Sequence, residues 1–275
     1  MKSRKELFEL SGKTALITGA AGLLGPKHAE ALLDYGADVV LTDIDSEKLK
    51  NCALSLKERY DENRIKWNVM NVVEKKSIEE VFQQHPQIDI LINNAAKDPK
   101  IKKGESLGPE SRFELMSEEY WKDGIDAIIN GTFLCSQIFC NKLLKQKKPG
   151  SIINISSDLG LIAPDQRIYK DPSLPDELQN VKPITYSAAK WAVIGMTKYL
   201  AVYFAEKGIR VNSLSPTGVY NNHPDSFVEK LTNIIPMKRM ANIEEYKGAI
   251  VFLASDASSY MTGSNIVIDG GKTVW

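Results

Sequence analysis

A tyrosine and a lysine stand four residues apart in this sequence, a spacing that suits acid–base chemistry. Tyr186 and Lys190 frame the segment Tyr-Ser-Ala-Ala-Lys. Residues four apart share one face of a helix, so we expect the phenol and the ammonium to be neighbours. A neighbouring cation favours the phenolate and moves the pKa of a tyrosine toward the range of a general acid or base. Ser157, at the end of a predicted strand, could hydrogen-bond a substrate carbonyl beside that tyrosine.

A glycine-rich turn at residues 18–25 reads Thr-Gly-Ala-Ala-Gly-Leu-Leu-Gly, between a predicted strand and a helix that starts at Pro26. Its glycines, Gly19, Gly22 and Gly25, would let the backbone approach a pyrophosphate. The N-terminus of the helix would face that anion with free N–H groups and its dipole. The strand before the turn and the helix after it are the context that a dinucleotide-binding turn requires.

Asp43 ends the second predicted strand, a position from which it could discriminate between NAD and NADP. Its carboxylate could accept hydrogen bonds from both hydroxyls of an adenine ribose, and its charge would repel a 2′-phosphate. The turn contains no Arg or Lys, and Ile44 follows Asp43. We therefore expect NAD (NADH) in preference to NADP. The structural alternative is a tight turn in which Asp43 caps the helix that starts at Ser46.

Short apolar, β-branched segments alternate with amphipathic ones along the whole chain. Strands are predicted near Thr14–Thr18, Asp38–Thr42, Ile65–Asn68, Ile88–Asn93, Ser151–Ile155, Ile209–Ser213 and Ile266–Ile268. Helices are predicted to begin at or near Pro26, Ser46, Ser77, Ser117, Thr185 and Ile243. The alternation predicts an α/β fold: one Rossmann-type, doubly wound domain over residues 1–275, with a seven-stranded parallel sheet and helices on both faces.

The composition excludes several classes of protein. The 275 residues include 35 Lys or Arg and 35 Asp or Glu, without the basic excess that nucleic-acid or membrane-surface binding needs. No apolar run approaches the roughly 20 residues that span a bilayer, and the N-terminus does not read as a signal peptide. The three histidines and three cysteines lack ligand spacing. We expect no metal, no nucleic acid, no membrane and a reducing cytoplasm.

Several motifs together resemble those of the short-chain dehydrogenase/reductase family over nearly the whole chain. They are TGAAGLLG, Asp43, the NNAA segment from Asn93, NISS at Asn154–Ser157, YSAAK, RVNSLSP at Arg210–Pro216 and the DGG segment at Asp269–Gly271. The resemblance implies a Rossmann-type fold, a nicotinamide cofactor, and oxidation of an alcohol or reduction of a ketone.

The resemblance also implies roles for individual residues. Tyr186 would be the acid or base, Lys190 would lower its pKa and hold the nicotinamide ribose, and Ser157 would orient the reacting oxygen. The cofactor residues would be Gly19, Gly22, Leu24, Gly25, Asp43, Asn71, Val72, Asn93 and Val219, together with Tyr186 and Lys190. Asn93 would lie against the adenosine ribose, Asn71 would accept a bond from the adenine amino group, and Val219 would cover the nicotinamide.

Three features depart from the family pattern. Ile128 stands where members usually carry an Asn, and Asn130, two residues on, should face away because two residues turn a helix by about 200°. The usual proton-relay site is therefore in doubt. The glycine spacing is TGxxGxxG, and Ala96 replaces a usual Gly; both features are found in the extended branch of the family. Length and the other motifs favour the shorter branch.

The separation of 29 positions between Ser157 and Tyr186 is the largest departure, since the family usually needs about a dozen. Tyr169 lies at the usual distance, but no Lys follows it by four residues, so Tyr186 is the better candidate. The extra residues form an insertion at 163–183, and a second turn-rich segment spans 215–236. Arg167 and His223, one in each, are candidates for substrate contact. A subunit-contact loop is the alternative for the insertion.

A narrower resemblance is to bacterial dehydrogenases of flagellin-modification and nonulosonic-acid pathways, which implies a sugar or amino-sugar derivative as substrate. Two alternatives remain at this point: a nucleotide-sugar epimerase or dehydratase with tightly bound NAD, and a non-catalytic cofactor sensor on the same fold. By resemblance, we expect a homo-oligomer, a dimer or a tetramer, built on helices within Ser117–Lys148 and Thr185–Lys207.

Overall fold

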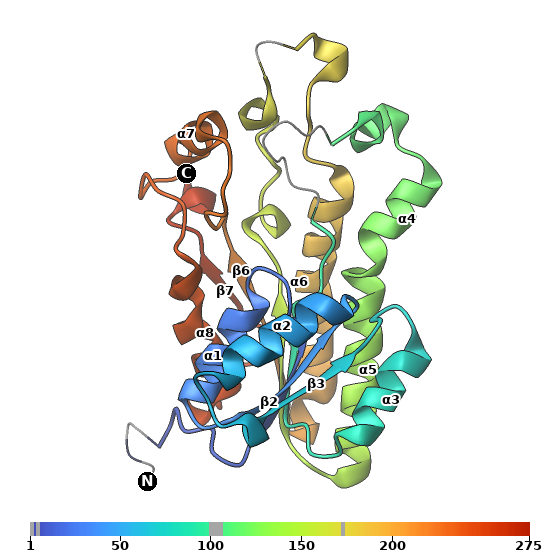
Figure 1. Ribbon diagram of the computed structural model, residues 1–275, viewed down its shortest axis with the longest axis vertical. Coiled ribbons are helices and arrows are strands. Elements are labelled where there is room, and N and C mark those ends of the chain that lie inside the picture. Colours follow the sequence, from blue (N-terminus) through green and yellow to red (C-terminus); the bar gives the residue numbers. More distant parts are fainter. Residues whose placement is uncertain (1–2, 4–5, 99–106, 172–173) are drawn as a thin grey trace.

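The computed structural model describes residues 3, 6–98, 107–171 and 174–275, and within them seven parallel strands form one sheet (Figure 1). The strands are β1 (Thr14–Thr18), β2 (Asp38–Asp43), β3 (Ile65–Val69), β4 (Ile90–Asn93), β5 (Gly150–Ile155), β6 (Ile209–Pro216) and β7 (Asn265–Ile268). Their order is β3-β2-β1-β4-β5-β6-β7, with every neighbouring pair parallel. The predicted Rossmann-type α/β fold is confirmed. Residues 172–173 of the insertion lie outside the described residues.

Helices cover both faces of the sheet because its strands are apolar on both sides. Ile17 of β1 packs into a core with α1 (Gly25–Asp34), α2 (Ser46–Lys57) and α8 (Lys247–Ala254). Leu16, its neighbour, points the other way into a core with α3 (Lys75–Gln84), α5 (Ile129–Gln146) and α6 (Ile184–Phe204). Two further helices are α4 (Glu118–Asp126), which precedes α5, and α7 (Asp225–Asn233), seen above the sheet in Figure 1.

Two elements differ by more than two residues from their predicted bounds. Strand β6 continues three residues past the predicted Ser213, because residues 213–216 pair with β7 at the edge of the sheet. The helix expected across residues 117–148 is two helices, interrupted at Ala127 and Ile128. Ser117 begins the first of them by accepting a hydrogen bond from the Tyr120 N–H at 3.1 Å.

The two segments that interrupt the strand–helix alternation pack against each other. Ile168, in a short 3-10 turn of the insertion (Gln166–Tyr169), is buried with Leu231 of α7 and with Ile235 and Met240. The insertion is therefore anchored by its own small apolar cluster beyond the carboxyl ends of the strands. Over the described residues, the structure contains no helix with the length and apolar character needed to cross a membrane.

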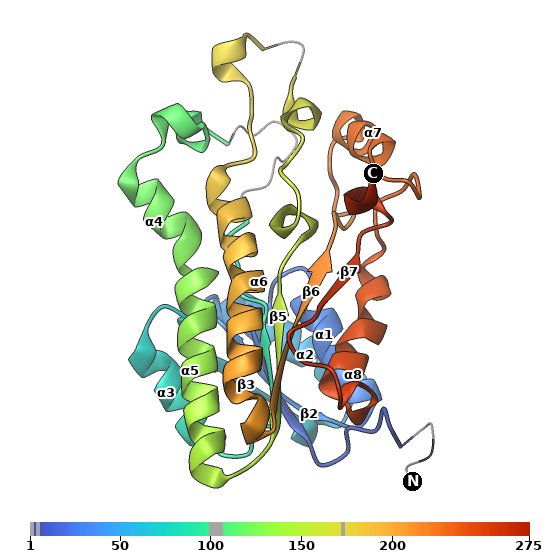
Figure 2. The same ribbon diagram turned by 180° about the vertical axis from the view of Figure 1, so that it is seen from behind.

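Polar bonds join the end of β5 to the middle of α6, which lie side by side in both views (Figures 1 and 2). The Ser156 hydroxyl donates to the Lys190 carbonyl at 2.8 Å, and the Asn154 amide donates to the Thr197 hydroxyl at 2.9 Å. Gly160 makes this approach possible. A Cβ on it would lie 2.6 Å from Ser156 Oγ and 2.8 Å from the Lys190 carbonyl oxygen.

We predict that Gly160→Ala destabilises the protein. The added methyl group must displace backbone on one side and a bonded hydroxyl on the other, which costs about 1–3 kcal/mol and corresponds to a fall in Tm on the order of 5 °C. Thermal unfolding at a fixed protein concentration measures it. The matched control is Gly248→Ala in α8, where the Cβ meets nothing within 4 Å. A Tm of Gly160→Ala equal to that of the control would contradict the close approach.

Candidate active site

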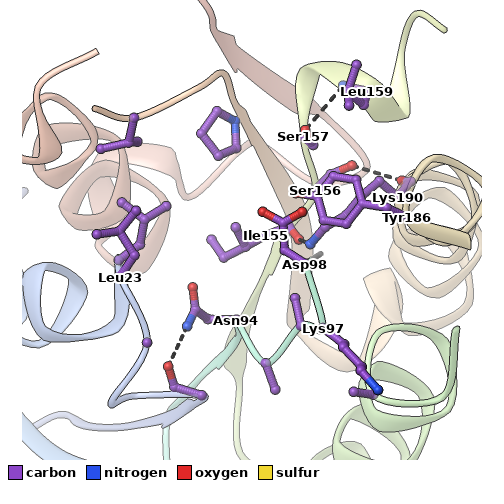
Figure 3. A pocket seen from close by; sticks show the side chains of 18 of the residues that line it. Leu23, Asn94, Lys97, Asp98, Ile155, Ser156, Ser157, Leu159, Tyr186 and Lys190 are labelled. Atoms are coloured by element: carbon purple, nitrogen blue, oxygen red, sulfur yellow. Dashed lines mark hydrogen bonds between the residues drawn. The ribbon is translucent and has the colours of Figure 1, made fainter. Parts of the chain in front are cut away.

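A cavity of about 760 Å³ opens at the carboxyl ends of the strands, within the size range of small-molecule sites. The glycine-rich turn and Asp43 line one part of it, and Ser157, Tyr186 and Lys190 line another. Figure 3 shows the second part, with Tyr186 and Lys190 side by side and Asp98 next to them. Residues predicted from four separate parts of the sequence thus share one cavity, as the switch point of a doubly wound sheet requires.

The glycine-rich turn packs tightly against the loop that follows β4. Gly19 has φ of +60°, and a Cβ on it would lie 2.7 Å from Ala95 Cα, so only glycine fits. The Asn94 amide donates to the Gly19 carbonyl at 2.8 Å. The turn leads into α1, whose first turn contains Pro26 and has no side-chain cap. This cradle of bare backbone at a helix N-terminus fits the pyrophosphate of a nicotinamide dinucleotide.

Asp43 is held by two backbone amides at the cavity wall. Its carboxylate accepts from Ala21 N–H at 3.0 Å and from Asp45 N–H at 3.1 Å. The cap of α2 is Asp45, which accepts from Lys48 N–H at 3.0 Å, and not Asp43. Each carboxylate oxygen has a second lone pair, so Asp43 retains acceptor sites for ribose hydroxyls. The structural alternative for this residue, a helix cap, is wrong.

Most of the other predicted cofactor residues line the cavity, and two do not. Gly22, Leu24, Asn71, Val72 and Val219 lie on its wall. Gly25 instead packs against Ala20, where a Cβ would lie 2.5 Å from the Ala20 carbonyl oxygen. The Asn93 amide is buried and donates to Ser136 and Asn154, at 3.0 and 2.8 Å, so this side chain braces β4 against its neighbours. Its neighbour Asn94 lies on the cavity wall in its place.

Ser157, Tyr186 and Lys190 come together where β5 ends and α6 begins. Tyr186 and Lys190 are one turn apart on α6, and the Lys190 Nζ donates to the Ile155 carbonyl at 2.7 Å. The Ser157 hydroxyl donates to Asp158 at 2.8 Å and accepts from Leu159 N–H at 3.2 Å. The bond between Lys190 and the Ile155 carbonyl holds the lysine at the end of β5, where Ser157 also lies.

Burial dominates the titration of these groups. It raises the pKa of Tyr186 well above the usual value; Asp98, Asp158 and Tyr169 raise this pKa further, and a hydrogen bond with Ser157 lowers it. Burial lowers the pKa of Lys190 to about 8, an effect that Asp98 opposes and Lys182 reinforces. Without a bound ligand, the phenol is therefore protonated at neutral pH and could act as a proton donor.

Two ion pairs in the cavity wall, one buried and one partly buried, were not predicted from the sequence. Asp98 pairs with Lys182, which lies inside the insertion, and Asp158 pairs with Lys272 at 2.7 Å. The Thr217 hydroxyl donates to the same Asp158 carboxylate at 2.8 Å. The position of Asp158 directly after Ser157 was a signal that could have been used. Nothing local in the sequence connects Asp98 to Lys182, which are 84 positions apart.

The structure separates the two expected substrate residues. His223 lines the cavity, and its ring stacks on Phe227 with centroids 5.3 Å apart. Arg167 does not line the cavity; its exposed guanidinium donates three hydrogen bonds to the Asp165 carboxylate instead. Tyr169, the alternative tyrosine, lies on the cavity wall, and its ring packs against Phe227 at a tilt of 49°, with centroids 5.6 Å apart.

The helix break before α5 places Ile128 beside the active site. Ile128 is buried against Ala189 and Val193 in the cluster that Tyr186 also contacts. Asn130 is exposed and bonds to Asp126, four residues earlier in the chain. As the spacing indicated, the asparagine faces away from the tyrosine, and an apolar side chain takes the position beside it.

Comparison with known proteins identifies the family. A family model described as "short chain dehydrogenase" matches residues 13–169, and one described as "Enoyl-(Acyl carrier protein) reductase" matches residues 177–273. The chain belongs to the short-chain dehydrogenase family. The predicted membership is confirmed, and with it the general class of oxidoreductases that act on alcohols or ketones with a nicotinamide cofactor.

Individual members of the short-chain dehydrogenase family match along almost their full length. The NAD-dependent glycerol dehydrogenase of Listeria innocua is 32% identical over 97% of this chain and 96% of its own. The NADP-dependent mannitol dehydrogenase of Alternaria alternata is 32% identical over 98% of this chain and 96% of its own. A crystal structure of a short-chain dehydrogenase from Leptospira borgpetersenii with bound NAD⁺ is 32% identical, covers 100% and 97% of the two chains, and has a TM-score of 0.82.

The lowered pKa of Lys190 predicts a pH-dependent stability in this dehydrogenase. Between the folded pKa, about 8, and the ordinary value of 10.5, the unfolded chain binds more protons than the native one. Raising the pH through this window therefore stabilises the native state. We expect the Tm difference, wild type minus Lys190→Met, to become more positive from about pH 7 to about pH 10 in protein without added cofactor.

Thermal unfolding at several pH values measures this difference, and Lys198→Met, which removes an exposed lysine of the same helix, is the matched control. A wild-type-minus-Lys190→Met difference that stays constant or falls with pH would show that the ammonium is not buried as described.

Proposed function

We propose that this protein is an NAD-dependent oxidoreductase that transfers hydride between the nicotinamide and an alcohol or ketone carbon of a sugar or amino-sugar derivative. One observation carries the proposal: Ser157, Tyr186 and Lys190 converge in the same cavity as the glycine-rich turn and Asp43. A bound nicotinamide supplies the hydride or accepts it. The protein must bind and orient the cofactor and the substrate, and it must exchange a proton with the substrate oxygen.

Each of the three converging residues has a step in this reaction. Tyr186 exchanges the proton of the substrate hydroxyl, as donor in reduction and acceptor in oxidation. Ser157, held in place by the Leu159 N–H, hydrogen-bonds the reacting oxygen and sets its position relative to the phenol. Lys190, bonded to the Ile155 carbonyl, places a positive charge behind the phenol and a donor toward the nicotinamide ribose. Ile128 leaves an apolar contact behind Tyr186, so we place no relay residue there.

Asp43 supports the preference for NAD over NADP. Its carboxylate faces the part of the cavity beside the glycine-rich turn, where a 2′-phosphate would meet its charge. Lys48 also lines this part and could attract a phosphate, but its ammonium is bound to Asp45 at 2.6 Å. The relatives include an NAD-dependent and an NADP-dependent enzyme, so the proposal rests on Asp43.

The cavity wall favours a polyhydroxylated substrate. The ion pairs Asp98–Lys182 and Asp158–Lys272 offer carboxylate acceptors and ammonium donors close together, and a sugar presents hydroxyls that need both. His223 adds a further polar group. The Listeria and Alternaria relatives are named for glycerol and mannitol, which are polyols. The narrower link to flagellin-modification and nonulosonic-acid dehydrogenases remains part of this proposal.

We also propose a homo-oligomer, with α5 and α6 at its interface. The outer face of α5 and α6 is not covered by another labelled helix or strand in Figure 2. Five large apolar side chains of these two helices are about half or more exposed: Phe133, Trp191, Tyr199, Val202 and Tyr203. Tyr199 and Tyr203 stack on each other with centroids 5.9 Å apart, which makes part of this face a continuous aromatic surface. An apolar face of this kind favours association with a second copy.

We predict that Tyr186→Phe lowers the rate of NADH formation by about 10²–10⁴-fold while cofactor affinity is retained, because the variant removes only the proton-exchanging hydroxyl. The assay follows the absorbance of reduced nicotinamide with NAD⁺ and a panel of glycerol, mannitol and amino-sugar derivatives. Tyr169→Phe, the matched variant, should lose far less. The proposal fails if Tyr186→Phe turns over at the wild-type rate. Substrate conversion without net NADH would indicate the epimerase or dehydratase, and cofactor binding with no conversion the sensor.

We predict that Asp43→Ser shifts cofactor preference toward NADP⁺. Removing the carboxylate eliminates both the ribose acceptor and the repulsion of a 2′-phosphate, so the ratio of the NADP⁺ Kd to the NAD⁺ Kd should fall by at least about tenfold. Calorimetric titration of both cofactors measures it. Glu47→Gln, which removes an exposed carboxylate of α2, is the control. Tighter binding of NADP⁺ than of NAD⁺ by the wild type would refute the assignment.

A further inference from the structure

The insertion brings a lysine directly over the ring of Tyr186. Lys182 Nζ lies 4.2 Å from the centroid of this ring, within the range of a cation–π interaction. The side chain is 8% exposed, although it belongs to a segment at the surface of the fold. Lys182 lines the same cavity as Tyr186.

Lys182 is held at both its backbone and its side chain. The Gln166 side-chain carbonyl accepts from Lys182 N–H at 2.8 Å, and the Gln166 amide donates to the Lys182 carbonyl at 3.0 Å. Its ammonium forms an ion pair with Asp98, which follows β4. Gln166 lies in the part of the insertion that the cluster around Ile168 anchors. A long, flexible side chain is thereby fixed in one place.

Lys182 is nearer to the Tyr186 ring than the lysine of the YSAAK segment is. Lys190 Nζ lies 5.5 Å from the same centroid and is bonded to the Ile155 carbonyl. The titratable and charged groups around the phenol come from every element packed on it: Asp98 after β4, Asp158 after β5, Tyr169 and Lys182 in the insertion, Lys190 on α6, and Lys272 on Asp158. Asp98, Asp158 and Tyr169 oppose the ionisation of the phenol. Of the two lysines over the ring, Lys182 is the nearer, so we expect its charge to offset them more than that of Lys190 does.

We propose that Lys182 is a positioning residue for Tyr186: its ammonium, oriented by Asp98 and Gln166, stabilises the phenolate that forms when the tyrosine takes a proton from the substrate hydroxyl. An anionic ring attracts a cation over its face more strongly than a neutral one does, and Lys182 is only 8% exposed, so this attraction is less screened than it would be at the surface. The insertion is then part of the acid–base apparatus.

The ion pair gives the proposal a directional signature. Lys182 favours the phenolate. Asp98 opposes it in two ways: its carboxylate repels the phenolate, and it partly neutralises the lysine charge. Removing one charge should therefore move the ionisation of Tyr186 in the opposite direction to removing the other. If the role of the pair were purely structural, removing either partner would shift the pH of Tyr186 ionisation in the same direction.

The test observes Tyr186 without any substrate. Protein labelled with ¹³C at the tyrosine Cζ atoms is titrated by NMR with NAD⁺ bound, and Tyr186→Phe identifies the Tyr186 signal. We expect Lys182→Met to raise the pH of ionisation by about one unit or more, Asp98→Asn to lower it, and Lys182→Arg, which keeps the charge, to stay close to the wild type. Lys170→Met is the matched control, because Lys170 is an exposed insertion lysine that pairs with Asp176.

Several outcomes would overturn the inference. These are ionisation of Lys182→Met at the wild-type pH, an equal shift in Lys170→Met, or no ionisation of the wild type below the pH at which circular dichroism shows unfolding. If Lys182→Met does not fold, Asp98→Asn decides: ionisation at or above the wild-type pH contradicts the proposal. The inference rests on the role proposed for Tyr186, but its readout needs no turnover, so a protein that oxidises none of the panel would refute the proposed function separately.

Discussion

The active site depends on the close contact between the end of β5 and helix α6. The Ser156 hydroxyl donates to the Lys190 backbone carbonyl, for which Gly160 leaves room, and the Lys190 ammonium donates to the Ile155 carbonyl. These bonds place Ser157 against the first turns of α6, where Tyr186 lies. The insertion separates the serine from the tyrosine in the sequence, yet it leaves this contact intact because it extends beyond the sheet edge and not through the contact (Figure 2).

A second constraint is that the cavity wall contains charged side chains that are largely removed from water. Asp98, Asp158, Lys182 and Lys272 all reach a mostly buried cavity wall, and burying an unpaired charge is costly. Each carboxylate is paired with one lysine, so the local charge is close to balanced. The pairs join distant parts of the chain: the loop after β4 to the insertion, and the loop after β5 to the C-terminal segment. They therefore link the part of the cavity around Tyr186 to the rest of the fold.

Much of the fold and of the cofactor end was predictable, because both depend on local signals. Strand positions followed from β-branched runs, the turn from its glycines, and the Tyr186–Lys190 pair from helical spacing. The bounds of β6 and the break at Ile128 were not predictable, since the first depends on pairing with β7 and the second lies within a continuous helical pattern. Arg167 was chosen for its charge and its place in the insertion, but its neighbour Asp165 binds it outside the cavity.

By itself, the sequence determined the family, the parallel sheet, the glycine-rich turn and the placing of Tyr186 and Lys190 on one helix face, since residue types and their spacing are sufficient for each. Only the tertiary structure decided which of the two asparagines at the end of β4 lines the cavity, which aspartate caps α2, and which insertion residue reaches Tyr186. Asp98 and Lys182 are far apart in the chain and carry no shared local pattern. Their contact exists because parallel strands end at one edge of the sheet, where loops of any separation in sequence can meet.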